Sequence, residues 1–124
     1  MNIKPGLRLL VVDDAPFIRE IVRNVAEKNG IIVVGEGRDG DEAVELALKT
    51  DPDVILMDII MPKKSGIDAT KEILAQVPTT KVVAFSTADQ EFLVSQALEA
   101  GCVSYLVKPF STEELLKAID SAVV

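Results

Sequence analysis

The 124-residue sequence contains no histidine and no tryptophan, and it has one cysteine and one tyrosine. Without histidine, the chain cannot use an imidazole as a general base or as a metal ligand. A lone cysteine, Cys102, permits neither an intramolecular disulfide nor a cluster of metal-bound thiolates, so we expect a reduced, cytoplasmic setting. The apolar runs are too short to cross a membrane and the N-terminal residues lack the pattern of a signal peptide, so we expect no membrane association.

Positive charge is also scarce. The sequence has 13 Lys and Arg against 20 Asp and Glu, which gives a formal net charge of −7. This balance argues against direct binding of nucleic acid or of an anionic membrane through charge alone. Hydrophobic residues make up 48% of the chain, enough for one hydrophobic core at this length, and we expect a single domain over residues 1–124.

Short apolar runs recur along the chain and predict the strands. They are rich in Val, Ile and Leu, and they occupy residues 7–13, 31–36, 53–58, 81–86 and 103–108. Most are unbroken rather than alternating, which is typical of parallel strands covered on both faces.

Amphipathic patterns between these runs predict helices. Ile18, Val22 and Val25 follow the spacing of one helix face, Pro16 suits a first helical turn, and Ser111 with Glu114 forms a capping box. Strands and helices therefore alternate five times. This order predicts an α/β fold with an open five-stranded parallel sheet, doubly wound by five helices.

Polar side chains gather where four of the predicted strands end. Asp13 and Asp14 follow the first apolar run, Asp58 ends the third, Ser86 the fourth and Lys108 the fifth. In open α/β sheets, ligands bind beyond the carboxyl ends of the strands. The second run ends at Glu36 and Gly37 and offers nothing comparable. Three carboxylates, a hydroxyl and an ammonium are thus predicted to share one edge of the sheet.

Each of these residues also has a simpler explanation. Asp14 could cap the helix that begins near Pro16, Ser86 could bond only to the local backbone, and Lys108 could be a solvated charge. None of these explanations accounts for the shared edge.

The predicted cluster has a definite chemistry. Three neighbouring carboxylates need a counter-charge or must bind protons, and a hard divalent cation such as Mg²⁺ prefers oxygen ligands. A metal, an ammonium from Lys108 and a hydroxyl from Ser86 are suited to holding a phosphoryl group, and Asp58 could itself be the nucleophile.

Four motifs together resemble those of the receiver domain of bacterial two-component response regulators, in its CheY-like form. They are "LLVVDD", "MDIIMPKKSG", "FST" and "LVKPF", and the resemblance runs over the whole chain. It implies a flavodoxin-like fold with strand order 2-1-3-4-5.

The resemblance also implies roles for individual residues. Asp58 would be the phosphoacceptor, Asp14 a direct Mg²⁺ ligand, Asp13 a ligand through water, and Ile60 a ligand through its backbone carbonyl. Ser86 would bind the phosphoryl group, with Thr87 as the alternative, and Lys108 would pair with that group. Tyr105 would be the aromatic residue that changes position in the switch, and the peptide bond between Lys108 and Pro109 would be cis.

The function implied is a phosphorylation-activated switch rather than an enzyme, although the chain would assist its own phosphorylation and dephosphorylation. A histidine kinase or histidine phosphotransfer domain would donate the phosphoryl group. The surface of the fourth helix, fifth strand and fifth helix would then change for a protein partner, such as a flagellar switch in chemotaxis or an output domain. The alternatives are an interaction module that is never phosphorylated and a receiver from a longer transcriptional regulator.

Other positions leave more than one explanation open. Ile60 and Ala88 are apolar where the family tunes the loss of phosphate, so we expect slow dephosphorylation without a phosphatase. Lys63 and Lys64 could steer a phosphorylated donor or form a solvated pair. The pair Arg19 and Arg23, four residues apart, could dock a kinase or face solvent.

Overall fold

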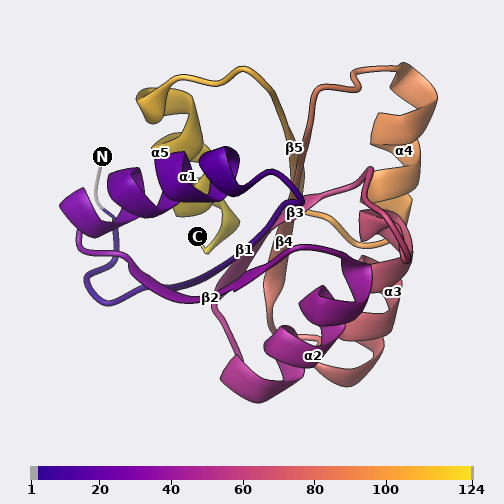
Figure 1. Cartoon of the computed structure of the whole chain (residues 1–124), viewed down its shortest axis with the longest axis horizontal. Coiled ribbons are helices and arrows are strands. Elements are labelled where there is room, and N and C mark those ends of the chain that lie inside the picture. Colours follow the sequence, from indigo (N-terminus) through magenta and orange to yellow (C-terminus); the bar gives the residue numbers. More distant parts are fainter. Residues whose placement is uncertain (1–2, 124) are drawn as a thin grey trace.

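A computed structural model describes residues 3–123 and consists of five strands alternating with five helices (Figure 1). The order is β1 (Arg8–Val12), α1 (Pro16–Lys28), β2 (Ile32–Gly37), α2 (Gly40–Thr50), β3 (Val54–Asp58), α3 (Gly66–Gln76), β4 (Lys81–Ser86), α4 (Glu91–Glu99), β5 (Ser104–Val107) and α5 (Thr112–Ala122). The predicted alternation is confirmed. Residues 1, 2 and 124 of the expected domain lie outside the described residues.

The strands form one sheet in the order β2-β1-β3-β4-β5, and every neighbouring pair is parallel. This is the strand order that the resemblance implies. Strand order reverses at β1 and β3, because the chain moves outward from β1 to β2 and then crosses to β3. The carboxyl ends of β1 and β3 therefore flank the crevice where open α/β sheets bind ligands.

Helices cover both faces of the sheet (Figure 1). Alternate strand residues point to opposite faces, so each strand contributes to two cores. Leu9, Val11, Leu56 and Phe85 pack with α1 and α5, and on the other face Leu10, Ile55 and Met57 pack with α2, α3 and α4.

Burial differs between the centre and the edges of the sheet. All of β3, and all of β1 and β4 beyond their first residues, is buried, as the unbroken apolar runs predict. Strands β2 and β5 are partly exposed, because each has a neighbour on one side only. The expectation of full cover therefore holds for the centre of the sheet alone.

Two helix starts can be compared with the local signals in the sequence, those of α5 and α1. The capping box of Ser111 and Glu114 is present, and α1 begins at Pro16. Its N-cap residue is Ala15 and no side chain caps this helix, so the interpretation of Asp14 as a helix cap is wrong. Among residues 3–123, no helix has the length and apolar character needed to cross a membrane.

Candidate functional site

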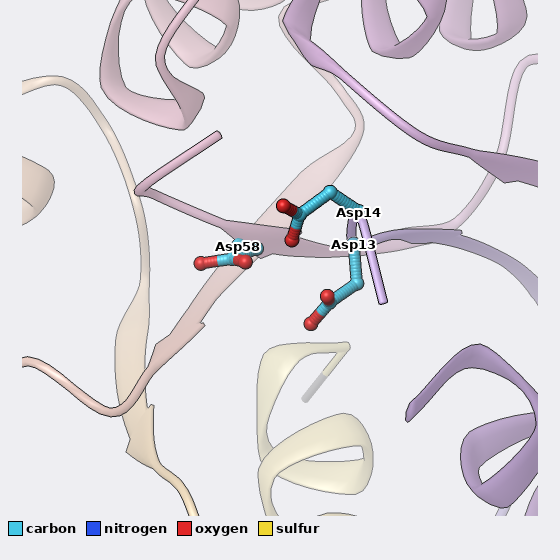
Figure 2. Close-up of side chains that lie close together, drawn as sticks. All are labelled: Asp13, Asp14 and Asp58. Atoms are coloured by element: carbon cyan, nitrogen blue, oxygen red, sulfur yellow. The ribbon is translucent and has the colours of Figure 1, made fainter. Parts of the chain in front are cut away.

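Three carboxylates meet at the carboxyl edge of the sheet. Asp13 and Asp14 follow β1, and Asp58 ends the neighbouring β3. One carboxylate oxygen from each lies within 4.8 Å of the others, and Figure 2 shows the three side chains grouped at this edge. Asp13 and Asp58 are buried, whereas Asp14 is exposed. The sheet thus brings together residues that are up to 45 positions apart.

Lys108, just beyond β5, reaches across to this cluster. Its ammonium pairs with the Asp13 carboxylate and lies 3.6 Å from Oδ2 of Asp58. It also lies 4.5 Å from the centroid of the Phe85 ring, and the Lys108 side chain is only 11% exposed. Phe85 therefore helps to hold the cation in a buried position, so Lys108 is not a solvated surface charge. The peptide bond between Lys108 and Pro109 is cis, as the resemblance implies.

The environment of Asp58 raises its pKa. Burial raises the pKa of Asp58 to about 6, Lys108 opposes this shift, and the neighbouring Asp13 adds to it. The backbone N–H of Ile60 donates to Asp58 Oδ1 at 3.2 Å. The proximity of Lys108 is therefore insufficient to offset the cost of burying this charge beside another carboxylate.

The loop after Asp58 is held close to the strand and to α2. A β-carbon on Gly66 would lie 2.1 Å from the carbonyl oxygen of Asp58, so only glycine fits there. Lys63 lies 3.7 Å from Asp39, and Lys64 forms ion pairs with Asp41 and Glu72. Both lysines thus pair with carboxylates of the same chain, which neither explanation drawn from the sequence anticipated.

The β4–α4 loop contributes hydroxyl groups. Ser86 is buried at the end of β4, and its Oγ accepts the backbone N–H of Ala88 at 3.1 Å, while Thr87 is exposed. The half-buried Tyr105 donates its hydroxyl to the carbonyl of Ala88. Ala88 therefore links the strand-end hydroxyl to the aromatic residue through its two backbone groups.

These groups border an open pocket of about 310 Å³. Its walls include the three aspartates, Ser86, Thr87 and Lys108, together with Phe17 and Ile60. Phe17 and Ile60 are 64% and 58% exposed, so apolar surface lies beside the charged groups of the pocket. The pocket is open to solvent, so the charged groups that line it can be reached from outside the chain.

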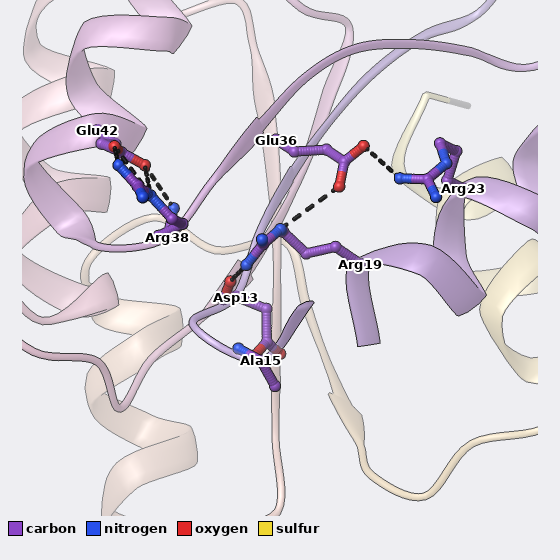
Figure 3. Close-up of polar contacts among 7 residues, drawn as sticks. All are labelled: Asp13, Ala15, Arg19, Arg23, Glu36, Arg38 and Glu42. Carbon is purple, nitrogen blue, oxygen red and sulfur yellow. Dashed lines mark hydrogen bonds and ion pairs between the residues drawn. The ribbon is translucent and has the colours of Figure 1, made fainter. Parts of the chain in front are cut away.

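Two arginines of α1 turn toward β2 (Figure 3). Nη1 of Arg19 donates to the backbone carbonyl of Asp13 at 2.5 Å, and its Nε lies 3.4 Å from Oε1 of Glu36. Arg23 donates to the other oxygen of Glu36 at 2.8 Å. The Arg19 side chain is 12% exposed, so the explanation of Arg19 as a solvent-facing residue is wrong.

Glu36 is the residue that sequence reasoning missed. The second apolar run ends at Glu36, and the sequence predicts no role for this residue at the edge of the sheet. The available signal was the pair Arg19 and Arg23, which projects from one face of a helix next to β2. A strand-end glutamate near two such arginines is a natural ion-pair partner.

The donor set fits a hard divalent cation. If all three carboxylates are ionised, Lys108 neutralises one charge and leaves a net charge of −2 on the cluster. Burial is the main cause of the raised pKa of Asp58, and the neighbouring charges of Asp13 and Asp14 add to it. Carboxylate oxygens at an accessible edge are the ligands that Mg²⁺ selects, because it keeps several water molecules in its coordination shell.

Comparison with known proteins identifies the family. The sequence pattern described as "Response regulator receiver domain" matches residues 9–120. The chain is 40% identical to chemotaxis protein CheY of Thermotoga maritima over 115 residues, which covers 93% of this chain and 96% of that protein. The chain belongs to the response regulator receiver domain family. Receiver domains are signalling phosphoacceptors that generally bind Mg²⁺ at their acidic pocket.

Other relatives show how the family is used. The chain is 43% identical over 120 residues to the uncharacterized transcriptional regulatory protein YxjL of Bacillus subtilis, covering 96% of this chain but only 55% of YxjL. The crystal structure of a CheX–CheY–BeF₃–Mg²⁺ complex from Borrelia burgdorferi matches with a TM-score of 0.92 and 27% identity, covering 97% of this chain and 91% of that one. Receiver domains similar to this one thus occur under both chemotaxis and transcription names.

Proposed function

We propose that this receiver domain accepts a phosphoryl group on Asp58, with Mg²⁺ held by the neighbouring carboxylates. The observation that carries this proposal is the position of Asp58, which is buried beside Asp13 and Lys108 yet borders an open pocket. A buried carboxylate next to a fixed cation and a cation-binding oxygen set can attack phosphorus while the developing charge is neutralised.

The transfer is a displacement at phosphorus. An oxygen of the Asp58 carboxylate forms a bond to the phosphorus of a phosphohistidine on the donor protein. The P–N bond breaks, and its electron pair stays with the imidazole nitrogen of the donor. Hydrolysis would reset the switch: a water oxygen forms a bond to phosphorus, the bond from phosphorus to the Asp58 oxygen breaks with its electron pair on Asp58, and inorganic phosphate and the carboxylate result.

The surrounding residues orient and neutralise this group. Lys108 lies 3.6 Å from Asp58 and would pair with the phosphoryl oxygens. Ser86 is buried at the next strand end and would donate its hydroxyl to them, and its burial favours Ser86 over the exposed Thr87. Asp13, Asp14, Asp58 and the carbonyl of Ile60 would hold Mg²⁺. When bound, the metal supplies charge neutralisation and orients the phosphoryl oxygens.

Ala88 would connect the phosphorylation site to Tyr105. A phosphoryl group on Asp58 would draw the Ser86 hydroxyl toward itself, and Ala88, whose N–H donates to Ser86 Oγ, would be displaced with it. The same residue receives the Tyr105 hydroxyl, so a displaced Ala88 would release that ring. The surface of α4, β5 and α5 would then change, and phosphorylation would shift the population between two arrangements.

The partners follow from this mechanism. The donor would be a histidine kinase or a histidine phosphotransfer domain, and the target a protein that binds the α4–β5–α5 surface. A flagellar switch and an output domain are the two candidates, because both CheY and a transcriptional regulator are among the relatives. We also propose a cytoplasmic location and one receiver unit over residues 1–124.

The test is the intact mass of the chain after incubation with acetyl phosphate and Mg²⁺. We expect one added phosphoryl group. The matched controls are the same mixture with EDTA and the Asp58→Asn variant, and both should show no added mass. Beryllofluoride with Mg²⁺ provides a second probe that needs no chemical transfer.

A different result would assign another function. If neither acetyl phosphate nor beryllofluoride changes the chain, it acts as an interaction module on a receiver fold. If Asp58→Asn still gains the phosphoryl group, the acceptor is a different residue and the mechanism above is wrong.

A further inference from the structure

Arg19 joins the acidic turn to the edge strand of the sheet. Its guanidinium donates to the carbonyl of Asp13 at 2.5 Å and lies 3.4 Å from the Glu36 carboxylate, which Arg23 holds from the other side (Figure 3). We propose that Arg19 is a positioning residue that fixes the peptide between Asp13 and Asp14 and so sets the affinity of the acidic cluster for Mg²⁺. This inference depends on the metal site proposed above.

The contacts of Asp13 show what Arg19 adds. The Asp13 N–H donates to the carbonyl of Gly37 at 3.0 Å, and Asp13 Oδ1 accepts the N–H of Ala15 at 2.8 Å. Lys108 pairs with the other carboxylate oxygen. The backbone carbonyl is the remaining polar group of Asp13, and Arg19 is its partner. Every polar group of Asp13 therefore has a hydrogen-bond or ion-pair partner.

Asp14 depends on that arrangement. Its side chain is exposed, and it follows directly on the carbonyl that Arg19 holds. Two adjacent carboxylates repel each other. Without the hydrogen bond from Arg19, the turn could let these carboxylates move apart, which would lower their electrostatic energy. An anchored peptide keeps Asp14 beside Asp58 before a cation arrives, and a preorganised site binds more tightly because less order is lost on binding.

The shape of the side chain suits this role. A guanidinium presents several N–H donors in a planar fork, so one group can face both the Asp13 carbonyl and the Glu36 carboxylate. A lysine ammonium is a point charge and cannot reproduce the fork. Replacement by lysine thus separates a positioning role from a role of charge alone.

The experiment is a calorimetric titration of the metal-free chain with Mg²⁺ alone. The variants are Arg19→Lys and Arg19→Met, with Arg23→Met and Arg38→Met as matched controls that remove the same charge. Arg23 also contacts Glu36, whereas the exposed Arg38 pairs with Glu42. We expect about 10-fold weaker Mg²⁺ binding for both Arg19 variants, as for other residues that orient metal ligands, and changes below about twofold for the controls.

A second readout needs no metal. In ¹⁵N NMR spectra of the metal-free chain, we expect the amide resonances of Asp14 and Ala15 to shift or broaden in both Arg19 variants and to stay in place in Arg38→Met. Glu36→Gln, a milder variant that keeps Arg19, should move the same resonances less.

The outcomes separate the two proposals. Wild-type Mg²⁺ affinity in Arg19→Lys would overturn the positioning role, because charge alone would then suffice. Equal weakening in Arg19→Met and Arg38→Met would do the same. Absence of Mg²⁺ binding by the unchanged chain would overturn the metal site, and this inference with it.

Discussion

The β1–α1 turn and the β4–α4 loop flank Asp58 on opposite sides and are held in different ways. Asp13 in the turn has charged partners, Arg19 and Lys108, and both are largely buried. In the loop, Ala88 is held by two hydroxyl groups, those of Ser86 and Tyr105. No side chain caps the helix that follows either segment.

This difference fits the role proposed for each of the two segments. Hydrogen bonds to charged groups are about twice as strong as those between neutral groups. A turn that carries metal ligands would benefit from being fixed, whereas a loop that responds to phosphorylation must be able to move. In the proposed switch, the site would therefore combine a firmly held side and an adjustable side around Asp58.

The largest effect is expected from removal of Lys108, because its ammonium lies near the carboxylates of both Asp13 and Asp58. In Lys108→Met we expect phosphorylation by acetyl phosphate to be about 100-fold slower, because the fixed cation near the transferring group is lost. Intact mass against time measures the rate, and Lys108→Arg is the control that keeps the charge. A rate equal to that of the unchanged chain would show that Lys108 is only structural.

Ile60 tests whether the exposed side of the pocket controls the loss of phosphate. Its side chain is 58% exposed and offers water no polar contact. In Ile60→Asn we expect phosphate loss to be about 10-fold faster, because an amide can orient the attacking water. Phosphate release from the purified phosphorylated chain measures the rate. An unchanged rate would contradict the expected slow dephosphorylation, and Phe17→Asn is the control at the same rim.

Asp58 links the site to stability in the absence of Mg²⁺. Burial raises its pKa to about 6, so between its usual value near 3.8 and about 6 the folded chain binds more protons than the unfolded chain. Stability from this group is therefore present at low pH and is lost as the pH rises through 6. At pH 7.5 we expect the free energy of unfolding of Asp58→Asn to be about 1–2 kcal/mol higher than that of the unchanged chain.

Urea unfolding at pH 7.5 and pH 4, with EDTA present, measures this difference. We expect the advantage of Asp58→Asn to shrink at pH 4, where the carboxyl is protonated in the folded chain. A variant that is less stable than the unchanged chain at both pH values would show that burial of the charge is not costly.

The smallest effect on stability is expected from removal of the Tyr105 hydroxyl, which contacts the β4–α4 loop. Tyr105→Phe removes one neutral hydrogen bond to Ala88, which should lower the free energy of unfolding by about 1 kcal/mol or less. Arg19→Met removes a charge-assisted bond to Asp13 and should cost about 2 kcal/mol. Urea unfolding of both variants checks the order. The reverse order would mean that the loop is held more firmly than the turn.

Much of the fold could be predicted because its signals are local. Unbroken apolar runs gave the buried strands β1, β3 and β4, and the capping box at Ser111 marks the start of α5. The position of Asp13, Asp14 and Asp58 at one edge followed from the alternation of strands and helices alone. The interpretation of Asp14 as a helix cap is wrong, because the α1 N-cap residue is Ala15 and the side chain that accepts a backbone N–H in this turn is that of Asp13.

The remaining features depend on contacts between distant segments. Glu36, Arg19 and Asp13 lie on a strand, a helix and a turn, and the sequence does not show that they meet. The lysines after Asp58 likewise find partners at the start of α2 and on α3. Spacing along a helix indicates which residues share a face, but it does not show what that face contacts.

The sequence by itself determined the order of the elements, the central strands and the residues at the carboxyl edge of the sheet, because these depend on periodicity and on the rule that parallel strands end together. The tertiary structure alone decided the burial of Asp58, the place of Lys108 over Phe85, and the anchoring of the acidic turn by Arg19. Those features arise when side chains from different elements desolvate one another, and that depends on packing in three dimensions.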